Sequence, residues 1–438
     1  MKAISKLRFD ALAGYVRIPT ARLIVSELDW YEEGNEKVLG VLLLDIHDQD
    51  YGYCLLGRDR KKRFRAVKTG SSFATVAEAR RELRRSLVKC AKWKNEKFHQ
   101  GDEKGEPLDF FTPVVKEEKM SESFKRVFSN EERPARGLLA EMMNWYEDVD
   151  GNFVQQFQST GFDARLWELY LYALFNELGY TFNRDYAAPD FLCEGLPGKF
   201  FVEATTVNPS AVPPTEDELT QKGYSENYVP IKFGSALFSK LQKKYWELPH
   251  VEGLPLVFAV QDFHQPLSMT WSASALVQYL YGIRQTLNIK DDGSTEEIIE
   301  RIDTYEWKGK KIPAGFFRQP DTEHVSAVIA NPGGTVAKFD RMGFIAGFGD
   351  KNIEITRRGL CFRESDVPEE FRQEVSVPGY SESWVEGLSV YHNPNAVHPL
   401  PEHFIPGAAH FTMKDDSIVG VMPPFHPIGS ITSILVPR

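Results

Sequence analysis

The chain of 438 residues has few cysteines and no long apolar run, and both absences narrow its class. Its 4 cysteines are far apart and none stands in a CxxC spacing, which argues against a disulfide framework and against a cysteine zinc site. No apolar stretch approaches the roughly 20 residues of a membrane span. The first residues lack the apolar core of a signal peptide. We therefore expect a cytoplasmic protein without membrane association.

Acids outnumber basic residues in the chain as a whole, by 62 to 52, but positive charge is concentrated in one segment. The formal net charge is -10, whereas residues 58–97 carry 15 Lys and Arg against four acids, a local excess of +11. Such asymmetry predicts a surface that faces a polyanion, and nucleic acid is the expected partner. The alternative is a solvated helix face beside a charged hairpin. The residues expected to bind nucleic acid are Arg60, Lys61, Lys62, Arg63, Arg65, Arg81, Arg84 and Arg85.

The length predicts two or three domains, and the series of helix and strand signals predicts a mixed α/β class. We expect a basic N-terminal α/β module with a linker over 1–125, a core of helices and strands over 126–290, and a β-rich region over 291–438 that can add strands to the core. The patterns predict strands over Val38–Leu44, Tyr51–Leu56, Pro255–Val260 and Thr335–Phe339, and helices over Val76–Trp93, Ala164–Leu178 and Ser235–Leu248. Thr75 and Asp163 are the expected caps of the first two helices.

A predicted hairpin brings two carboxylates together. Two strand-like runs flank the turn at 195–198, and pairing Glu194 with Lys199 places Asp190 directly opposite Glu203. Opposed residues on one sheet face have Cβ atoms about 4.5–5.5 Å apart. Two carboxylates at that distance repel each other unless a proton or a cation lies between them. The sequence therefore predicts a site for a hard divalent cation, with an ordinary surface hairpin as the alternative.

Side-chain alternation supports the same register. Phe191 and Cys193 on the first strand, and Phe200, Val202 and Ala204 on the second, point away from the two acids and predict a buried face. A slip of one residue would move both acids into this face, so the register is well specified.

A third acid, Glu168, lies on the helix predicted before this hairpin, beside apolar neighbours. Burying a carboxylate there is costly unless it is paired or binds a metal. A helix with a Glu, then Pro189-Asp190 at a strand start, then a strand carrying Glu203-Ala204-Thr205, resembles the PD-(D/E)xK nuclease superfamily. The likeness covers roughly residues 135–265. It implies a restriction-endonuclease-like core, with a mixed sheet flanked by helices.

The resemblance also implies a role for each acid. Asp190 and Glu203 would ligate Mg²⁺ or Mn²⁺, with Glu168 helping directly or through water, and the reaction would be hydrolysis of a phosphodiester bond. The last position of the family motif is usually Lys, whereas this chain has Thr205. A hydroxyl can orient water but adds no positive charge. The lysines of the following predicted helix can replace it, and among Lys240, Lys243 and Lys244 we expect Lys243.

The leading hypothesis is thus a metal-dependent endonuclease that acts on DNA rather than RNA. A role in prokaryotic restriction or antiviral defence is what the resemblance alone implies. The alternative is a non-catalytic nucleic-acid-binding or assembly protein with a degenerate nuclease fold. A hydrolase of some other phosphoester is a third option. A protein partner or a second copy of the chain stays open. No helicase or ATPase motif is present, so energy-coupled activity would need a partner.

Overall fold

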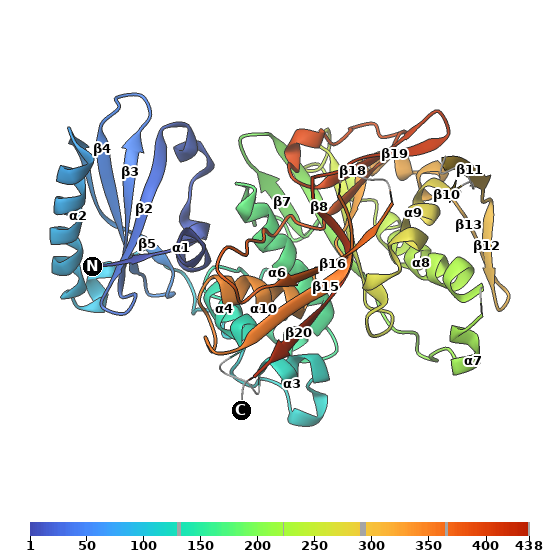
Figure 1. Cartoon of the computed structure of the whole chain (residues 1–438), viewed down its shortest axis with the longest axis horizontal. Helices are drawn as coiled ribbons and strands as arrows, with labels where there is room; N and C mark the ends of the chain where they lie inside the picture. Colours follow the sequence, from blue (N-terminus) through green and yellow to red (C-terminus); the bar gives the residue numbers. More distant parts are fainter. Residues whose placement is uncertain (129–132, 222, 290–294, 364–366, 437–438) are drawn as a thin grey trace.

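The computed structural model describes residues 1–128, 133–221, 223–289, 295–363 and 367–436. They form an N-terminal module and a larger body of mixed α/β structure (Figure 1). The expected fold class is confirmed, since a mixed sheet flanked by helices is joined by a strand-rich last third. Within these residues, no helix has the length and apolar character needed to cross a lipid bilayer.

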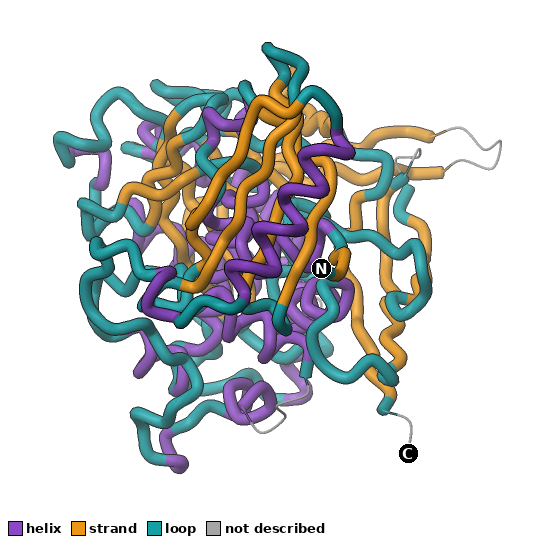
Figure 2. Tube along the Cα trace, turned by 90° about the vertical axis from the view of Figure 1, so that its left-hand side faces the viewer, coloured by secondary structure: helices purple, strands orange, loops and turns teal. Residues whose placement is uncertain are grey.

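The N-terminal module is an antiparallel sheet with a helix on each face. Its strands lie in the order β1 (Lys2–Ile4), β2 (Val25–Glu33), β3 (Val38–Asp45), β4 (Tyr51–Arg58) and β5 (Phe64–Phe73). α2 (Val76–Ala91) covers one face through Leu83 and Leu87, and Thr75 caps it as predicted. α1 (Lys6–Ala13) packs on the other face. Figure 2 shows α2 in front of these strands.

α1 also joins the module to the larger body. It packs against α4 (Pro134–Met142) and α10 (Val336–Ile345). At the end of β4, the guanidinium of Arg58 donates two hydrogen bonds of 3.0 Å to the carboxylate of Glu141 on α4. The module is therefore attached by side-chain contacts as well as by the linker.

One mixed sheet of eight strands lies at the centre of the larger body, in the order β19-β18-β17-β14-β9-β8-β7-β6. The strands are β6 (Thr181–Asn183), β7 (Phe191–Glu194), β8 (Lys199–Val207), β9 (Leu256–Asp262), β14 (Ala327–Ala330), β17 (Ser389–His392), β18 (Ala409–Lys414) and β19 (Ser417–Val421). Four of them come from the last third of the chain. Strands from both sides of the boundary expected at residue 290 therefore share one sheet, in keeping with the expectation that the last region can add strands to the core; residues 290–294 themselves lie outside the described residues.

Helices cover both faces of this sheet. α6 (Phe162–Glu177) lies on one face, where the indole of Trp167 donates a 3.1 Å hydrogen bond to the carbonyl of Ala259. α8 (Val229–Leu241) and α9 (Ala273–Tyr281) lie on the other. A buried apolar core lies on each face of the sheet. The hairpin of β7 and β8 lies between β9 and β6, so it is an interior element of the sheet.

The predicted alternation in that hairpin is confirmed. The first core contains Phe191, Cys193, Phe200, Val202 and Ala204. The opposite face of the hairpin, which carries the two acids, is also covered. Its apolar residues Leu192 and Phe201 join the core on the α8 side. The alternative of an exposed surface hairpin is thereby excluded.

The remaining elements surround the two cores. They are α3 (Glu122–Phe128), α5 (Phe153–Gln158), α7 (Glu216–Leu219), the hairpin of β10 (Ile283–Ile289) and β11 (Thr295–Arg301), the hairpin of β12 (Thr304–Trp307) and β13 (Lys310–Pro313), and a three-stranded sheet of β16 (Glu369–Glu374), β15 (Glu354–Phe362) and β20 (His426–Leu435).

Three sequence expectations need correction. The strand expected over Thr335–Phe339 is the start of helix α10, whose Phe339 and Met342 reach the core at helical spacing. Asp163 lies in the first turn of α6, and Gly161 occupies the cap position. The helix expected over Ser235–Leu248 is α8, which begins six residues earlier and ends at Leu241.

Candidate active site

The hairpin register that sets the two acids is as predicted. Glu194 pairs with Lys199 and Phe191 pairs with Val202, so the residue before β7 reaches Glu203 on β8. The backbone N–H of Asp190 donates to Oε2 of Glu203 at 3.2 Å. The Oδ2 atom of Asp190 accepts from the backbone N–H of the residue after Glu203 at 2.7 Å. The two acids therefore meet at one point of the sheet.

A lysine and a tyrosine hold the carboxylate of Glu203. Lys240, in the last turn of α8, forms an ion pair with Oε1 of Glu203. The hydroxyl of Tyr245 donates to the same oxygen at 2.6 Å. Glu203 is 4 % exposed, so this pairing offsets the cost of burying its charge.

The electrostatics of the site favour a proton or a cation at Asp190. Burial, then the charge of Glu203 and then that of Glu168, raise the pKa of Asp190 well above its ordinary value. Burial alone would lower the pKa of Lys240, but contact with Glu203 outweighs it and raises that pKa. Lys240 is accordingly a permanent cation at neutral pH. Displaced carboxyl pKa values of this kind are common at functional sites.

Glu168 lies on α6 near the pair but is occupied by other partners. Arg165 donates to both of its oxygens at 2.9 Å, and the hydroxyl of Tyr146 donates at 3.2 Å. Burial raises the pKa of Glu168, although Arg165 opposes this shift. Across the described ranges, no group of three His, Cys, Asp or Glu side chains is close enough to hold one ion. The structure thus brings Asp190 and Glu203 together and gives Glu168 an electrostatic role beside them.

The position that usually carries the motif lysine is neutral, as the sequence indicates. Thr205 lies on β8 opposite Val260 and is partly buried. The expectation for Lys243 is corrected, because α8 ends at Leu241 and Lys243 is exposed beyond it. The cation that contacts Glu203 is Lys240, which sequence reasoning named only as an alternative.

Two further residues of the site were missed by sequence reasoning. Tyr245 reaches Glu203 because the chain turns sharply at Lys244, whose φ of 51° is left-handed. Arg184 donates to the carbonyl of Asp190 at 2.8 Å, and its guanidinium lies over the ring of Phe191. The sequence signal for Arg184 was weak, since only its place six residues before Asp190 connects the two.

The predicted nucleic-acid surface divides into two parts. On the β4–β5 turn, carboxylates already pair with several of the cations: Arg60 with Glu106 at 3.0 Å, Arg63 with Asp59 at 2.8 Å, and Arg65 with Asp102 at 2.5 Å. Lys61 is partly buried and Lys62 is exposed. On α2, Arg85 contacts Glu82 at 2.8 Å, while Arg81 and Arg84 are exposed. The outer face of α2 is therefore the stronger part of the surface.

Comparison of the chain with family models, with curated proteins and with solved structures found no match. Its function is therefore argued from the geometry above.

Proposed function

We propose that this chain is a metal-dependent nuclease of the PD-(D/E)xK type, in which Lys240 replaces the missing motif lysine. The observation that carries the proposal is the meeting of Asp190, Glu203 and Lys240 at the end of a buried hairpin. The order of Glu168, Asp190 and Glu203 along the chain is the order that the resemblance requires.

The residues at the site fit Mg²⁺ or Mn²⁺. Magnesium in nucleases is commonly held by one or two carboxylates together with waters and substrate phosphates, and two carboxylates meet here. The raised pKa of Asp190 is the sign of negative charge that lacks a neutralising partner. Asp190 and Glu203 would hold the ion, with Glu168 beside them. When bound, the ion supplies positive charge at a phosphodiester and promotes ionisation of an attacking water.

Lys240 supplies the charge that Thr205 cannot. Because its pKa is raised, Lys240 keeps its proton and acts as a cation rather than as a general base. Its ion pair with Glu203 fixes the ammonium within reach of a phosphate that approaches the two acids. Thr205, on the same strand two residues beyond Glu203, has a hydroxyl that can orient water.

The outer face of α2 would add affinity for the nucleic-acid backbone. Arg81 and Arg84 are exposed there, and phosphate contacts of this kind are independent of sequence and sensitive to salt. We expect DNA rather than RNA as the substrate, and a cytoplasmic site of action in restriction or antiviral defence. A protein partner or a second copy of the chain would supply any triggering.

A cleavage assay with matched variants tests the proposal. The purified protein is incubated with plasmid DNA, single-stranded DNA and RNA in Mg²⁺, Mn²⁺ or EDTA. We expect cleavage that needs the ion and that Asp190→Asn and Glu203→Gln each reduce about 1,000-fold. Asp185→Asn, an exposed acid in the same loop, is the control and should cleave normally. Cleavage that survives both site variants would refute the mechanism.

One observation favours a second function, that of a non-catalytic nucleic-acid-binding or assembly protein. Glu203 is already neutralised by Lys240 and Tyr245, and no three-ligand metal group exists among the described residues. In that case the protein would bind DNA in gel-shift assays with unchanged affinity in EDTA. It would leave every substrate intact in both Mg²⁺ and Mn²⁺.

A further inference from the structure

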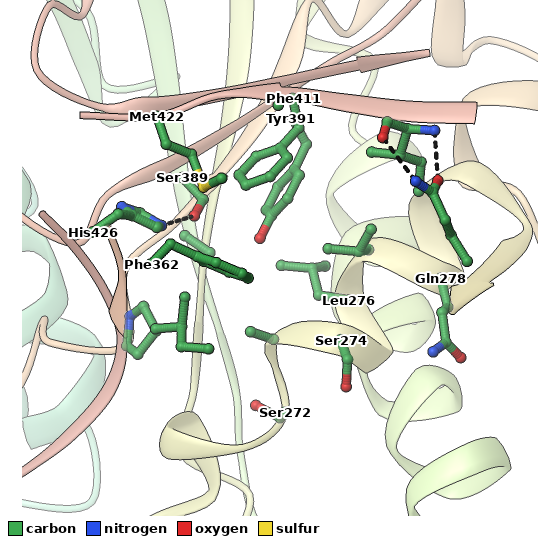
Figure 3. Close-up of a pocket in the computed structure, with 18 of the residues that line it drawn as sticks. Ser272, Ser274, Leu276, Gln278, Phe362, Ser389, Tyr391, Phe411, Met422 and His426 are labelled. Atoms are coloured by element: carbon green, nitrogen blue, oxygen red, sulfur yellow. Dashed lines mark hydrogen bonds between the residues drawn. The ribbon is translucent and has the colours of Figure 1, made fainter. Parts of the chain in front are cut away.

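A large cavity draws its lining from several elements, among them α8, the helix that also carries Lys240. Its volume is about 750 Å³, within the usual range for small-molecule sites. β9 supplies Val260 and Asp262, and α8 supplies Phe233, two turns before Lys240. α9, the strands β17 and β18, and the three-stranded sheet complete the walls (Figure 3).

Aromatic and aliphatic side chains make up much of the wall. Phe362, Tyr391 and Phe411 lie around the cavity with Leu276 and Met422 (Figure 3). Two of these rings, Tyr391 and Phe411, are stacked at 5.2 Å between centroids. Flat rings of this kind favour a flat, apolar or aromatic ligand.

Two buried polar atoms of the lining residues have no hydrogen-bond partner among the described residues. Asp262 is 3 % exposed, and its Oδ1 accepts from the backbone N–H of His264 at 3.0 Å and lies 2.7 Å from Nδ1 of the same residue, whereas Oδ2 has no donor. His426 is 1 % exposed, and its Nε2 lies 3.2 Å from the hydroxyl of Ser389, whereas Nδ1 is unpaired. Burial lowers the pKa of His426 to about 4, so its ring is neutral.

Unpaired buried polar atoms are expensive, and native proteins rarely keep them. The free oxygen of Asp262 requires an N–H or O–H donor. Ser272, Ser274 and Gln278 add further polar groups at the α9 side. A ligand with a flat ring and at least one N–H donor would satisfy Asp262 while its ring contacts the aromatic wall.

The charge of the lining residues excludes an anionic ligand. Among the described residues that form the cavity, two are acids, Asp262 and Glu297, and none is Lys or Arg. A phosphate or a carboxylate would therefore meet negative charge and find no lining cation to replace its hydration, since Lys232, which interacts electrostatically with Asp262, does not line the cavity. The ligand is uncharged or cationic, which separates this cavity from a site for nucleotides or for the nucleic-acid backbone.

We propose that this cavity binds a free nucleoside whose base carries an amino group, with that group donating to Oδ2 of Asp262. The inference stands apart from the proposed nuclease activity, because it concerns different residues and an uncharged ligand.

The test is calorimetric titration of the full chain with adenosine, guanosine and cytidine at up to millimolar concentration. At least one should bind, and its 5′-monophosphate should bind about 10- to 100-fold more weakly because of the acidic lining. If adenosine binds, purine riboside, which lacks the amino group, should be weaker by a similar factor. Failure of all three nucleosides to bind overturns the proposal, as does equal binding of the monophosphate.

Two variants place the binding in this cavity. Asp262→Asn keeps an oxygen for His264 but presents an amide donor where the ligand needs an acceptor, so binding should fall about 10- to 100-fold. Ser274→Trp adds a large ring at an exposed lining position on α9 and should weaken or block binding. Ser71→Trp, on the distant N-terminal sheet, is the matched control. Melting curves confirm that each variant is folded. Binding that neither Asp262→Asn nor Ser274→Trp weakens would overturn the proposal.

Discussion

Two clusters of buried charge in this chain differ in how completely their charges are paired. In the first, Glu382 contacts Lys338 at 3.0 Å and Arg341 at 2.8 Å, and Arg357 lies at 3.6 Å. Burial alone would raise the pKa of Glu382, but Arg341 and Lys338 hold it well below the ordinary value. Every charge in this cluster has an opposite charge beside it.

The second cluster is the carboxylate site. Here a single ammonium, that of Lys240, contacts Glu203, while the carboxylate of Asp190 accepts one backbone hydrogen bond, from Ala204, and has a raised pKa. The comparison teaches that burial of charge does not by itself indicate function. The two clusters differ in whether the protein neutralises all of its own buried carboxylates, and the incomplete pairing at Asp190 is what the proposed metal site would explain.

Breaking the paired cluster should have the largest effect on stability. Glu382→Gln leaves three cations near a neutral group and should lower the free energy of unfolding by about 3–5 kcal/mol. Urea denaturation measures this change. Glu374→Gln removes an exposed carboxylate beside Arg372 and should have no measurable effect. Equal stability of the two variants would mean that the buried network is not structural.

Removing the cation of the second cluster should affect activity instead. Lys240→Met should reduce the cleavage rate about 100- to 1,000-fold by deleting positive charge at the site. Lys243→Met is the matched control three residues further along the chain, because that side chain is exposed past the end of α8. The rates of both variants are compared with that of the wild type. A larger loss of activity in Lys243→Met would mean that Lys243, not Lys240, replaces the lysine that is missing at Thr205.

Neutralising Asp190 should stabilise the metal-free protein. The folded-state pKa of Asp190 lies above its ordinary value of 3.8, so its contribution to folding is favourable below that pH and is lost as pH rises through the folded-state pKa. At pH 7 without metal, Asp190→Asn should therefore gain stability on the order of 1 kcal/mol. The gain should shrink as pH falls toward 4. Melting temperatures across this range check the sign, and a destabilised variant at pH 7 would contradict it.

The exposed charges of α2 should give the smallest effect. The double variant Arg81→Gln with Arg84→Gln should weaken DNA binding and reduce the dependence of log affinity on log salt by about 1–2. Arg372→Gln, a paired arginine on the three-stranded sheet, should change neither quantity. Fluorescence anisotropy at several salt concentrations gives the slope. An unchanged slope in the double variant would remove α2 from the binding surface.

Sequence patterns predicted the hairpin well because its information is local. The alternation of Phe200, Val202 and Ala204, together with a short turn, allows one register only, and that register brings Asp190 to Glu203. The fold class followed from the same alternation of strand and helix signals. That the last third can add strands to the core was expected, but the order of the strands in the central sheet was not predicted, because strand order is set by long-range packing.

The lysine that contacts Glu203 could not be identified from sequence, because its position depends on where a helix ends. α8 begins at Val229 and stops at Leu241, so its last turn presents Lys240 rather than Lys243. The strand predicted from Thr335 to Phe339 was wrong for a related reason. Thr and Val are favoured in strands, but packing against the core stabilises a helix here. Of the partners of Glu168, Tyr146 reaches it by tertiary contact, whereas Arg165 lies three residues earlier on the same helix.

Direct measurement of metal binding tests the central claim most directly. Mn²⁺ is titrated into wild-type protein and Asp190→Asn, and free Mn²⁺ is followed by electron paramagnetic resonance. We predict that each wild-type chain binds at least one Mn²⁺ and that Mg²⁺ displaces it. Asp190→Asn should lose this binding, whereas Asp185→Asn should bind Mn²⁺ normally. Equal Mn²⁺ binding by wild type and Asp190→Asn, or none by either, would contradict the assignment of the Asp190–Glu203 pair as the metal site.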